Sequence, residues 1–480
     1  MFPFGHSIGQ DQVDNGETLS LDEVLEMAMD KSISSLKAST IRKNSYWQWR
    51  TFKSNYLPQL SLDGVLPEFN RIISPVTQPD GNIKFQPISN SSSFLNLSLI
   101  QGISATGGEV FVNSQMQRFD DFQNHATSYN SNPAIIGFRQ PLFAFNNLNW
   151  DRKIEPLRYE ESEKLFNEEM EVIRYVTTQY YFQLLQEQIA LSIAKKNLAN
   201  NDTILKIAQV KYELGKINRG EILQLQLALK NDQKSLAQAK LAFETAILNL
   251  STYIGLTLNE GTTFIIPEIL PQFQVDEQIA LNEAKKNRQK AVAFRRAIVE
   301  ADRAVAKAKG DNGLNAQLFA SFGLTNRADN IPDIYQNLDN QQSIRLGFTI
   351  PIMDWGRSAS RIKTAQANQE LIRYSVAQDE INFNQEIYTQ IRQFEMLREQ
   401  VNITNEANQI AGERYNIFKE RYLIGELSLT DLNIAQQEKD QATRDFIKTV
   451  KDFWEANANL RLLTLYDFEQ QKTIIYKSNI

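Results

Sequence analysis

Cysteine is absent from this 480-residue chain, and histidine occurs only twice, at His6 and His125. Zinc sites, iron–sulfur clusters and thiol nucleophiles depend on these side chains, so metal and cysteine chemistry have almost no ligands here. The sequence also contains no Gly-rich phosphate loop and no Ser/His/Asp arrangement. We therefore expect a protein that is not an enzyme and that uses no cofactor and no metal.

The chain also lacks a basic excess. Lysine and arginine number 51 against 57 aspartates and glutamates, which gives a formal net charge of -6 at pH 7. A protein that neutralises nucleic-acid phosphates usually carries a basic surface or a basic stripe. The short basic run over 285–290 predicts a solvated helix face instead, and we expect no nucleic-acid partner.

Long apolar runs are missing too, because no stretch approaches the 18 or more apolar residues of a membrane-spanning helix. A membrane-spanning part would therefore have to be a closed β-barrel. Residues 2–8 resemble the end of a signal peptide whose basic start is absent. We expect a residual signal segment over 1–16 with cleavage near Gly9; the alternative is the ordinary tail of a cytosolic protein.

The chain does contain an internal duplication, with two long segments that repeat at a spacing of 210 residues. The sequence GFRQPLF at 137–143 matches GFTIPIM at 347–353, and Tyr212 and Gly215 match Tyr422 and Gly425. The first segment of each half matches more loosely. The predicted organisation is a first repeat at 17–265 (a helix, strands over 59–143, a long helical hairpin over 144–256), a linker at 266–273, a second repeat at 274–470 (a helix, strands over 314–353, a hairpin over 354–468) and a C-terminal tail at 471–480.

The strands follow a two-residue period. Large apolar residues alternate with polar or small ones at Ile344, Leu346, Phe348 and Ile350. One face of such a strand is apolar and the other is polar, a pattern that fits either a sandwich strand or a lipid-facing barrel strand. In the second case these four side chains would face lipid.

The segments after the strands predict very long helices. Between Phe143 and Leu214 there is no glycine and only one proline, Pro156, so a nearly continuous helix of about 70 residues would reach roughly 100 Å. The second copy, 354–424, would be about as long. Both return segments carry a seven-residue rhythm, which Lys439 breaks in the second one, and this rhythm predicts coiled-coil packing. An elongated coiled-coil structural or adaptor protein without a barrel would explain the helices and leave the amphipathic strands unexplained.

A strand that ends in PLF or PIMDWGR, then a very long helix, a Tyr-x-x-Gly turn and a coiled return helix occur in this order twice. This organisation resembles the TolC family of outer-membrane efflux proteins over residues 19–468. The resemblance implies an internally duplicated α+β membrane protein whose long antiparallel coiled-coil helices form a periplasmic α-barrel. Its strands, four from each protomer, would contribute to a trimeric outer-membrane β-barrel. The segment 94–122 is an extra hairpin that this pattern does not need, and we favour four strands.

The resemblance also implies the function and the partners. The chain would be the outer-membrane exit duct of a tripartite efflux or type I secretion system in a Gram-negative bacterium, and would export small molecules or polypeptides passively. It would form a homotrimer in outer-membrane lipid, extend into the periplasm, and bind a periplasmic adaptor (membrane fusion) protein and an inner-membrane pump. The absent cysteine separates it from the acylated branch of the family.

Two sets of site residues are expected where the helices reverse. Glycine adopts positive φ there without a steric penalty, and these turns would form the tip that docks the adaptor: Gly215, Lys216, Asn218, Gly425, Glu426 and Ser428. By resemblance, Glu221 and Asp431 would line the aperture, and Tyr422 would close it by a hydrogen bond to Glu221. Alternatively, Glu221 and Asp431 are simply acidic residues at the start of a helix, where they interact with the positive end of the helix dipole. Leu427 and Ile434 replace a basic and an acidic residue of the family pattern.

Overall fold

The computed structural model describes residues 18–259, 261–267 and 270–477, so the expected signal segment at 1–16 lies outside the described residues. The chain divides into two compact units. A helical unit contains residues 1–44, 161–291 and 379–480, and a sheet unit contains residues 45–160 and 292–378. Each unit takes segments from both halves of the duplication. The compact units are therefore not the sequence repeats.

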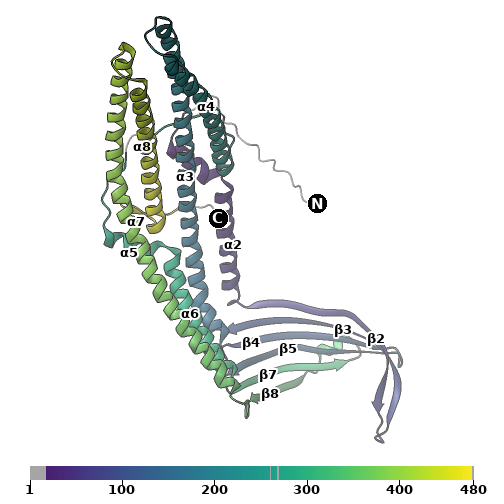
Figure 1. Ribbon diagram of the computed structural model, residues 1–480. Helices are drawn as coiled ribbons and strands as arrows, with labels where there is room; N and C mark the ends of the chain where they lie inside the picture. The colour runs from purple at the N-terminus through teal and green to yellow at the C-terminus, as the bar shows by residue number, and fades with distance from the viewer. Residues whose placement is uncertain (1–17, 260, 268–269, 478–480) are drawn as a thin grey trace. The chain divides into compact units, whose positions relative to one another are not determined.

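Two long helical hairpins carry the duplication (Figure 1). The first consists of α3, Asn147–Glu213, and α4, Arg219–Ile254. The second consists of α7, Arg357–Ile424, and α8, Leu429–Thr464. Pro156 lies inside α3, which continues past it for a total of 67 residues. In the described part of the chain, no helix is both long and apolar enough to cross a membrane.

Shorter helices precede each hairpin. They are α1, Leu21–Lys31, and α2, Ile33–Ser54, in the first half, and α5, Glu277–Asn287, and α6, Gln289–Asp311, in the second. Helix α1 begins with a capping box, in which the Ser20 hydroxyl accepts from the Glu23 N–H and the Glu23 carboxylate accepts from the Ser20 N–H. Helix α5 begins similarly, with the Asp276 side chain accepting from the N–H of Ile279 at 2.9 Å.

The core of the helical unit is apolar, with a small ionic cluster inside it. Phe394 and Phe453 are both 0% exposed, and their rings stack at 5.2 Å. The helical unit also contains two pairs of short strands. Strand β1, Thr18–Leu19, pairs with β6, Thr263–Phe264, and β9, Tyr466–Asp467, pairs with β10, Lys472–Thr473. The guanidinium of Arg461 contacts the carboxylates of Glu171, at 3.2 Å, and Asp467.

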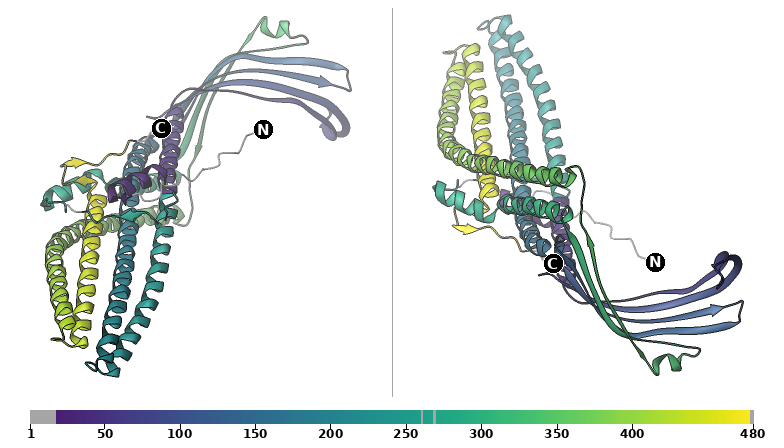
Figure 2. Two further views of the ribbon diagram at one scale, coloured as in Figure 1. Left: turned by 90° about the horizontal axis from the view of Figure 1, so that it is seen from above. Right: turned by 90° about the horizontal axis from the view of Figure 1, so that it is seen from below.

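The sheet unit contains one antiparallel sheet with the strand order β2-β3-β4-β5-β7-β8 (Figure 2). Its strands are β2, Gln59–Thr77; β3, Ile83–Ile103; β4, Gly108–Asp121; β5, Ala126–Leu142; β7, Asn315–Ala328; and β8, Asp339–Thr349. A short 3-10 helix, η1, at Pro332–Tyr335, connects the last two strands. The chain therefore gives four strands from its first half and two from its second to one sheet.

The expectation that each protomer would give four strands to the sheet was wrong. The extra hairpin predicted over 94–122 corresponds to the end of β3 and to β4, and both strands lie in the middle of the sheet between β2 and β5. They pair on both edges, with Leu97 opposite Leu62 on one side and opposite Ser114 on the other. Since the ladder satisfies their backbone N–H and C=O groups in this position, the hairpin belongs to the sheet, which has six strands.

One face of the sheet is apolar across all six strands. The cross-strand register places Leu60 opposite Leu99, Leu99 opposite Val112, and Val112 opposite Ile136. We call the following exposed side chains on this face the apolar band: Leu60, Leu62, Leu97, Leu99, Val110, Val112, Ile136, Phe322, Ile344, Leu346 and Phe348. Ile350 lies one residue beyond β8 and is also exposed.

The opposite face is mainly polar. The Ser98 hydroxyl donates to the Asn113 side-chain oxygen at 2.8 Å, and Arg139 forms an ion pair with Glu109. Aromatic rings lie on this face as well: Phe111 stacks on Phe319 at 5.9 Å and covers Gly137, where a Cβ atom would clash with the ring. Each strand therefore separates an apolar surface from a polar one, as the two-residue period predicts.

Candidate functional site

The two long hairpins end in the same turn. Gly215 has φ +68° and Gly425 has φ +89°, the positive φ values that the sequence predicts for these glycines. Next to them, the N–H of Lys216 donates to the carbonyl of Lys211 at 2.8 Å, and the N–H of Glu426 donates to the carbonyl of Arg421 at 2.9 Å. Such bonds close the last turn of a helix and require a left-handed residue. The duplication thus preserves the backbone of the turn.

Each return helix then begins with a capped acidic residue. The Asn218 side chain accepts from the N–H of Glu221 at 3.1 Å and donates to the Glu221 carboxylate at 3.2 Å. The Ser428 hydroxyl likewise accepts from the N–H of Asp431 at 3.2 Å and donates to its carboxylate at 2.6 Å. Both predicted aperture acids therefore stand at a helix N-terminus, where the dipole favours a negative charge.

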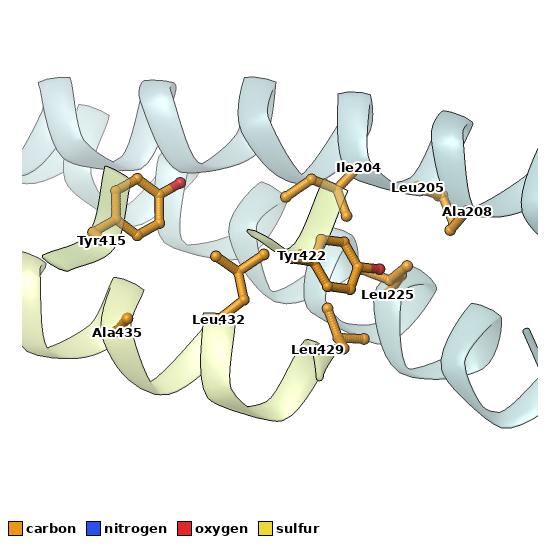
Figure 3. Close-up of a cluster of buried hydrophobic side chains, with 9 residues drawn as sticks. All are labelled: Ile204, Leu205, Ala208, Leu225, Tyr415, Tyr422, Leu429, Leu432 and Ala435. Atoms are coloured by element: carbon orange, nitrogen blue, oxygen red, sulfur yellow. The ribbon is translucent and has the colours of Figure 1, made fainter. Parts of the chain in front are cut away.

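Tyr422 lies in an apolar cluster that joins the two hairpins (Figure 3). Its ring is 7% exposed and packs among side chains of α3, α4 and α8. The buried members of this cluster are Ile204, Leu205, Ala208, Leu225, Tyr415, Tyr422, Leu429, Leu432 and Ala435. Burial raises the pKa of the Tyr422 hydroxyl, and the nearby negative charge of Glu221 raises it further. The cluster holds the tyrosine as a neutral phenol.

No hydrogen bond joins the Tyr422 hydroxyl to the Glu221 carboxylate in the described part of this chain. The two groups are close enough for the carboxylate to affect the phenol, while the Glu221 carboxylate bonds to Asn218 instead. Lys211 also approaches: its ammonium lies 5.5 Å from the Tyr422 ring centroid and donates to the Leu423 carbonyl at 3.0 Å. A cation, a phenol and a carboxylate therefore meet where the two hairpins touch.

A cavity of about 610 Å³ opens between the two turns. Its wall includes the predicted aperture residues Glu221 and Tyr422 together with Lys216, Gly425 and Ser428 of the predicted tip. The remaining lining residues are Lys211, Ile217, Gln224, Leu423, Ile424, Leu427, Leu429 and Thr430. The fold thus brings residues that are more than 200 positions apart in the sequence to one groove.

The other predicted residues lie outside the groove lining. Asp431 and Glu426 are exposed, and Glu426 forms an ion pair with Arg421 at 3.4 Å. Gly215 belongs to the turn, and Asn218 caps α4. These residues fix the shape of the turns and set the charge around the groove.

A polar cluster farther along the same hairpins was not predicted as a site. Asn197 donates to Asp440 and Asn201 donates to Asp232, each at 2.6 Å, while Lys439 lies 3.1 Å from Asp440. Burial raises the pKa of Asp232 and the Asp440 charge raises it further, against the opposing effect of the Asn201 bond. The only signal in the sequence was the interruption of the seven-residue rhythm at Lys439.

The described ranges contain no group of three or more histidine, cysteine, aspartate or glutamate side chains placed to hold an ion. The second candidate site is the apolar band of the sheet. Ile344 is 81% exposed and Leu346 is 60% exposed. Such a large apolar surface in an isolated chain indicates contact with lipid or with another protein.

Comparisons with known proteins agree with this fold. The sequence model of the family described as outer membrane efflux protein matches residues 105–256 and 280–464. No curated protein sequence matches the chain significantly.

Several solved structures share the fold. The CmeC outer membrane channel of Campylobacter jejuni is 17% identical, with 92% of this chain and 85% of that chain covered and a TM-score of 0.67. The outer membrane protein VceC of Vibrio cholerae is 14% identical, with 93% and 95% covered and a TM-score of 0.63. The MtrE outer membrane channel of Neisseria gonorrhoeae is 16% identical, with 92% and 88% covered and a TM-score of 0.61.

Proposed function

Because the chain belongs to the outer membrane efflux protein family, we propose that it is the exit duct of a tripartite efflux or type I secretion system. The family assignment confirms the predicted resemblance, the duplicated α+β fold class, the outer-membrane location and the efflux role. The solved relatives are described as outer membrane channels or proteins. A channel acts passively, so the duct needs no catalytic group, and the inner-membrane pump would select the cargo.

The apolar band is the observation that carries this proposal. It runs over all six strands on one face, while the other face is polar. Lipid on the first face and water on the second would satisfy both surfaces. A coiled-coil scaffold outside a membrane would leave the whole band in water, which makes that alternative unfavourable.

Closure of the sheet requires other copies of the chain. The edge strands β2 and β8 each pair on one side only within the described sheet. Unpaired backbone groups in lipid cost several kcal/mol each, so three copies would close one barrel through one repeated interface. Three six-stranded sheets give eighteen strands, a wider barrel than the twelve-stranded form that the sequence resemblance implies.

The tip groove would bind the periplasmic adaptor. Its wall combines exposed apolar side chains, such as Ile424 at 72%, with the cations Lys211 and Lys216. The turn residues Gly215, Asn218, Glu426 and Ser428 keep the groove in shape. A hairpin of a partner protein with apolar and acidic side chains fits this chemistry. The inner-membrane pump would join through the adaptor.

The aperture would be lined by Glu221 and Asp431 from each copy. Three copies of each acid would form rings of carboxylates, which attract cations and repel anions. Tyr422 would hold the second hairpin against the first beside Glu221, since its ring is buried between them. The contact of the two hairpins within one chain supports this role.

Lysine substitutions on the two faces of β8 test the function. Leu346→Lys places a charge on the apolar band, which costs about 2–4 kcal/mol at the bilayer midplane, and we expect loss of the heat-modifiable oligomer from the outer-membrane fraction. Ser343→Lys on the polar face is the matched control and should assemble normally. Normal assembly of both variants would contradict the membrane assignment of this face.

A further inference from the structure

The structure contains the same strand-to-helix junction twice. Helices α3 and α7 start 210 residues apart, at 147 and 357, and α4 and α8 do so at 219 and 429. Upstream elements keep a different spacing of 256 residues: α1 and α5 start at 21 and 277, α2 and α6 at 33 and 289, and β2 and β7 at 59 and 315. These two offsets map the junction after β5 onto the junction after β8.

The first junction is covered within the chain. Strand β5 pairs with β7 as far as Leu142, opposite Ala316. The loop that follows places Phe145 on α6, where a Cβ atom at Gly310 would lie only 3.0 Å from the Phe145 Cβ. The ammonium of Lys307 lies 5.6 Å from the Phe145 ring centroid. The aromatic side chain is thus packed on the end of the helix that leads into the neighbouring strand.

The second junction contains the equivalent residues, but no described residue of the same chain packs over them. Strand β8 ends at Thr349, three residues before Ile352, the equivalent of Leu142. Ile352 is 96% exposed, and Trp355, the equivalent of Phe145, is 91% exposed. On the other edge of the sheet, Trp47 of α2 is 62% exposed. The exposed residues after β8 and the exposed side of α2 therefore lie at opposite edges of the sheet, and together they correspond to the two sides of the first junction.

We propose that Trp355 of one copy packs on helix α2 of the next copy, at Thr51 and Ser54. The spacing of 256 maps Lys307 onto Thr51 and Gly310 onto Ser54. Ser54 has a Cβ atom where Gly310 has none, so the loop that carries Trp355 would lie slightly farther from α2 than the Phe145 loop lies from α6. This contact rests on the proposed channel assembly and specifies the residues that join its copies.

The strand register agrees with this contact. Gln140 and Leu142 of β5 face Leu318 and Ala316 of β7, and the offsets convert these pairs into Ile350 opposite Leu62 and Ile352 opposite Leu60. Leu60 and Leu62 belong to the apolar band, and Ile350 and Ile352 continue the alternation of Ile344, Leu346 and Phe348 beyond the end of β8. A shift by one residue would have placed them against the polar face, so the agreement is an independent check. It also gives Ile350–Ile352 the strand partner that this segment lacks in a single copy.

The chemistry on the flanking helices is complementary as well. In the first junction Arg303 of α6 forms an ion pair with Asp151 of α3 at 3.0 Å. The offsets convert this pair into Trp47 of α2 and Arg361 of α7. A guanidinium over an indole face is a favourable cation–π pair. Both pairs therefore contain an arginine, which lies on α6 in the covered junction and on α7 in the proposed one.

Engineered disulfides test the contact, because the chain has no cysteine of its own. Ser54→Cys with Trp355→Cys should give a covalent trimer on a non-reducing gel, since Cβ atoms in disulfides lie about 3.5–4.5 Å apart. Lys53→Cys with Trp355→Cys is the matched control and should stay at the background level, because neighbouring helix residues point about 100° apart. A second pair, Asp63→Cys with Thr349→Cys, keeps Trp355 and should also cross-link.

Light scattering of the unoxidised protein in detergent distinguishes a failure of the proposed contact from a failure of the channel assembly. A trimer in which both test pairs cross-link no better than the control overturns the proposed contact and leaves the channel assembly standing. A monomer overturns the assembly itself and the contact with it. A trimer with cross-links in the two test pairs alone supports the contact.

Discussion

The two units of the molecule differ in the exposure of their large apolar side chains. In the helical unit the large rings are inside, as with Phe394 and Phe453. In the sheet unit Phe348 is 69% exposed and Ile344 is 81% exposed, although both lie in regular strands. The helical unit therefore contains its own hydrophobic core, whereas the sheet needs a surrounding that the single chain does not supply.

Alanine at a buried and at an exposed phenylalanine gives the largest difference. Phe453→Ala removes a fully buried ring and should lower the free energy of unfolding by about 3–5 kcal/mol. Phe348→Ala should change it by less than about 0.5 kcal/mol in detergent, since surface substitutions rarely do more. Denaturant unfolding followed by far-UV circular dichroism measures both. Equal losses would mean that Phe348 is packed in a core.

The glycine under Phe111 tests the polar face of the sheet. Gly137→Ala adds a methyl group where the Phe111 ring lies, and such overpacking should cost about 1–3 kcal/mol. Phe111→Leu in the same chain should recover most of the loss, because it removes the clashing ring atoms. Ser343→Ala, at a partly exposed position on the same face, is the control. A Gly137→Ala variant as stable as the parent would show that the ring is free to move away.

The hairpin tips give an effect on conduction rather than on stability. Tyr422→Phe with Glu221→Gln should raise the single-channel conductance of the purified trimer in planar bilayers, because the phenol hydroxyl and the neighbouring carboxylate charge are both removed from the contact between the hairpins. Asp431→Asn should lower cation preference and block by divalent ions. Glu426→Gln, an acid of the same turn outside the groove lining, is the matched control. Unchanged conductance and ion preference would place the constriction elsewhere.

Sequence patterns predicted most of this architecture because they are local. The positive φ of Gly215 and Gly425, the long helix through Pro156 and the alternation around Leu346 each depend on neighbouring residues. The place of the 94–122 hairpin did not follow, because the period of a strand is the same at the edge of a sheet and in its middle. Only the pairing of Leu97 with Leu62 and with Ser114 decides it.

For the candidate site, the family resemblance suggested Glu221, Asp431 and Tyr422, and their roles stay predictions. The caps at Asn218 and Ser428 are local signals. The groove between the hairpins depends on how α3 and α7 pack against each other, which no local pattern encodes. The pairing of Asn201 with Asp232 was hidden in the same way, since an acid inside a coiled-coil seam gives no indication of its partner.

The smallest expected effect concerns Asp232, where the core of the helical unit departs from its apolar character. Burial and the Asp440 charge raise the pKa of its carboxyl group above the ordinary value, so the folded state binds the proton more tightly than the unfolded state does. The protonated carboxyl group therefore stabilises the folded state fully below the ordinary carboxyl pKa of about 3.9. This stabilisation is lost as the pH rises through the pKa that the group has in the folded protein. Asp232→Asn mimics the protonated form and can keep a hydrogen bond to Asn201. We expect this variant to be slightly more stable than the parent at pH 7, and the difference should vanish near pH 3.5. Thermal unfolding across this range measures it, with Asp202→Asn, an exposed acid paired with Lys206, as the control. A variant that is less stable than the parent at pH 7 would show that the charged carboxylate is a stabilising partner of the polar cluster.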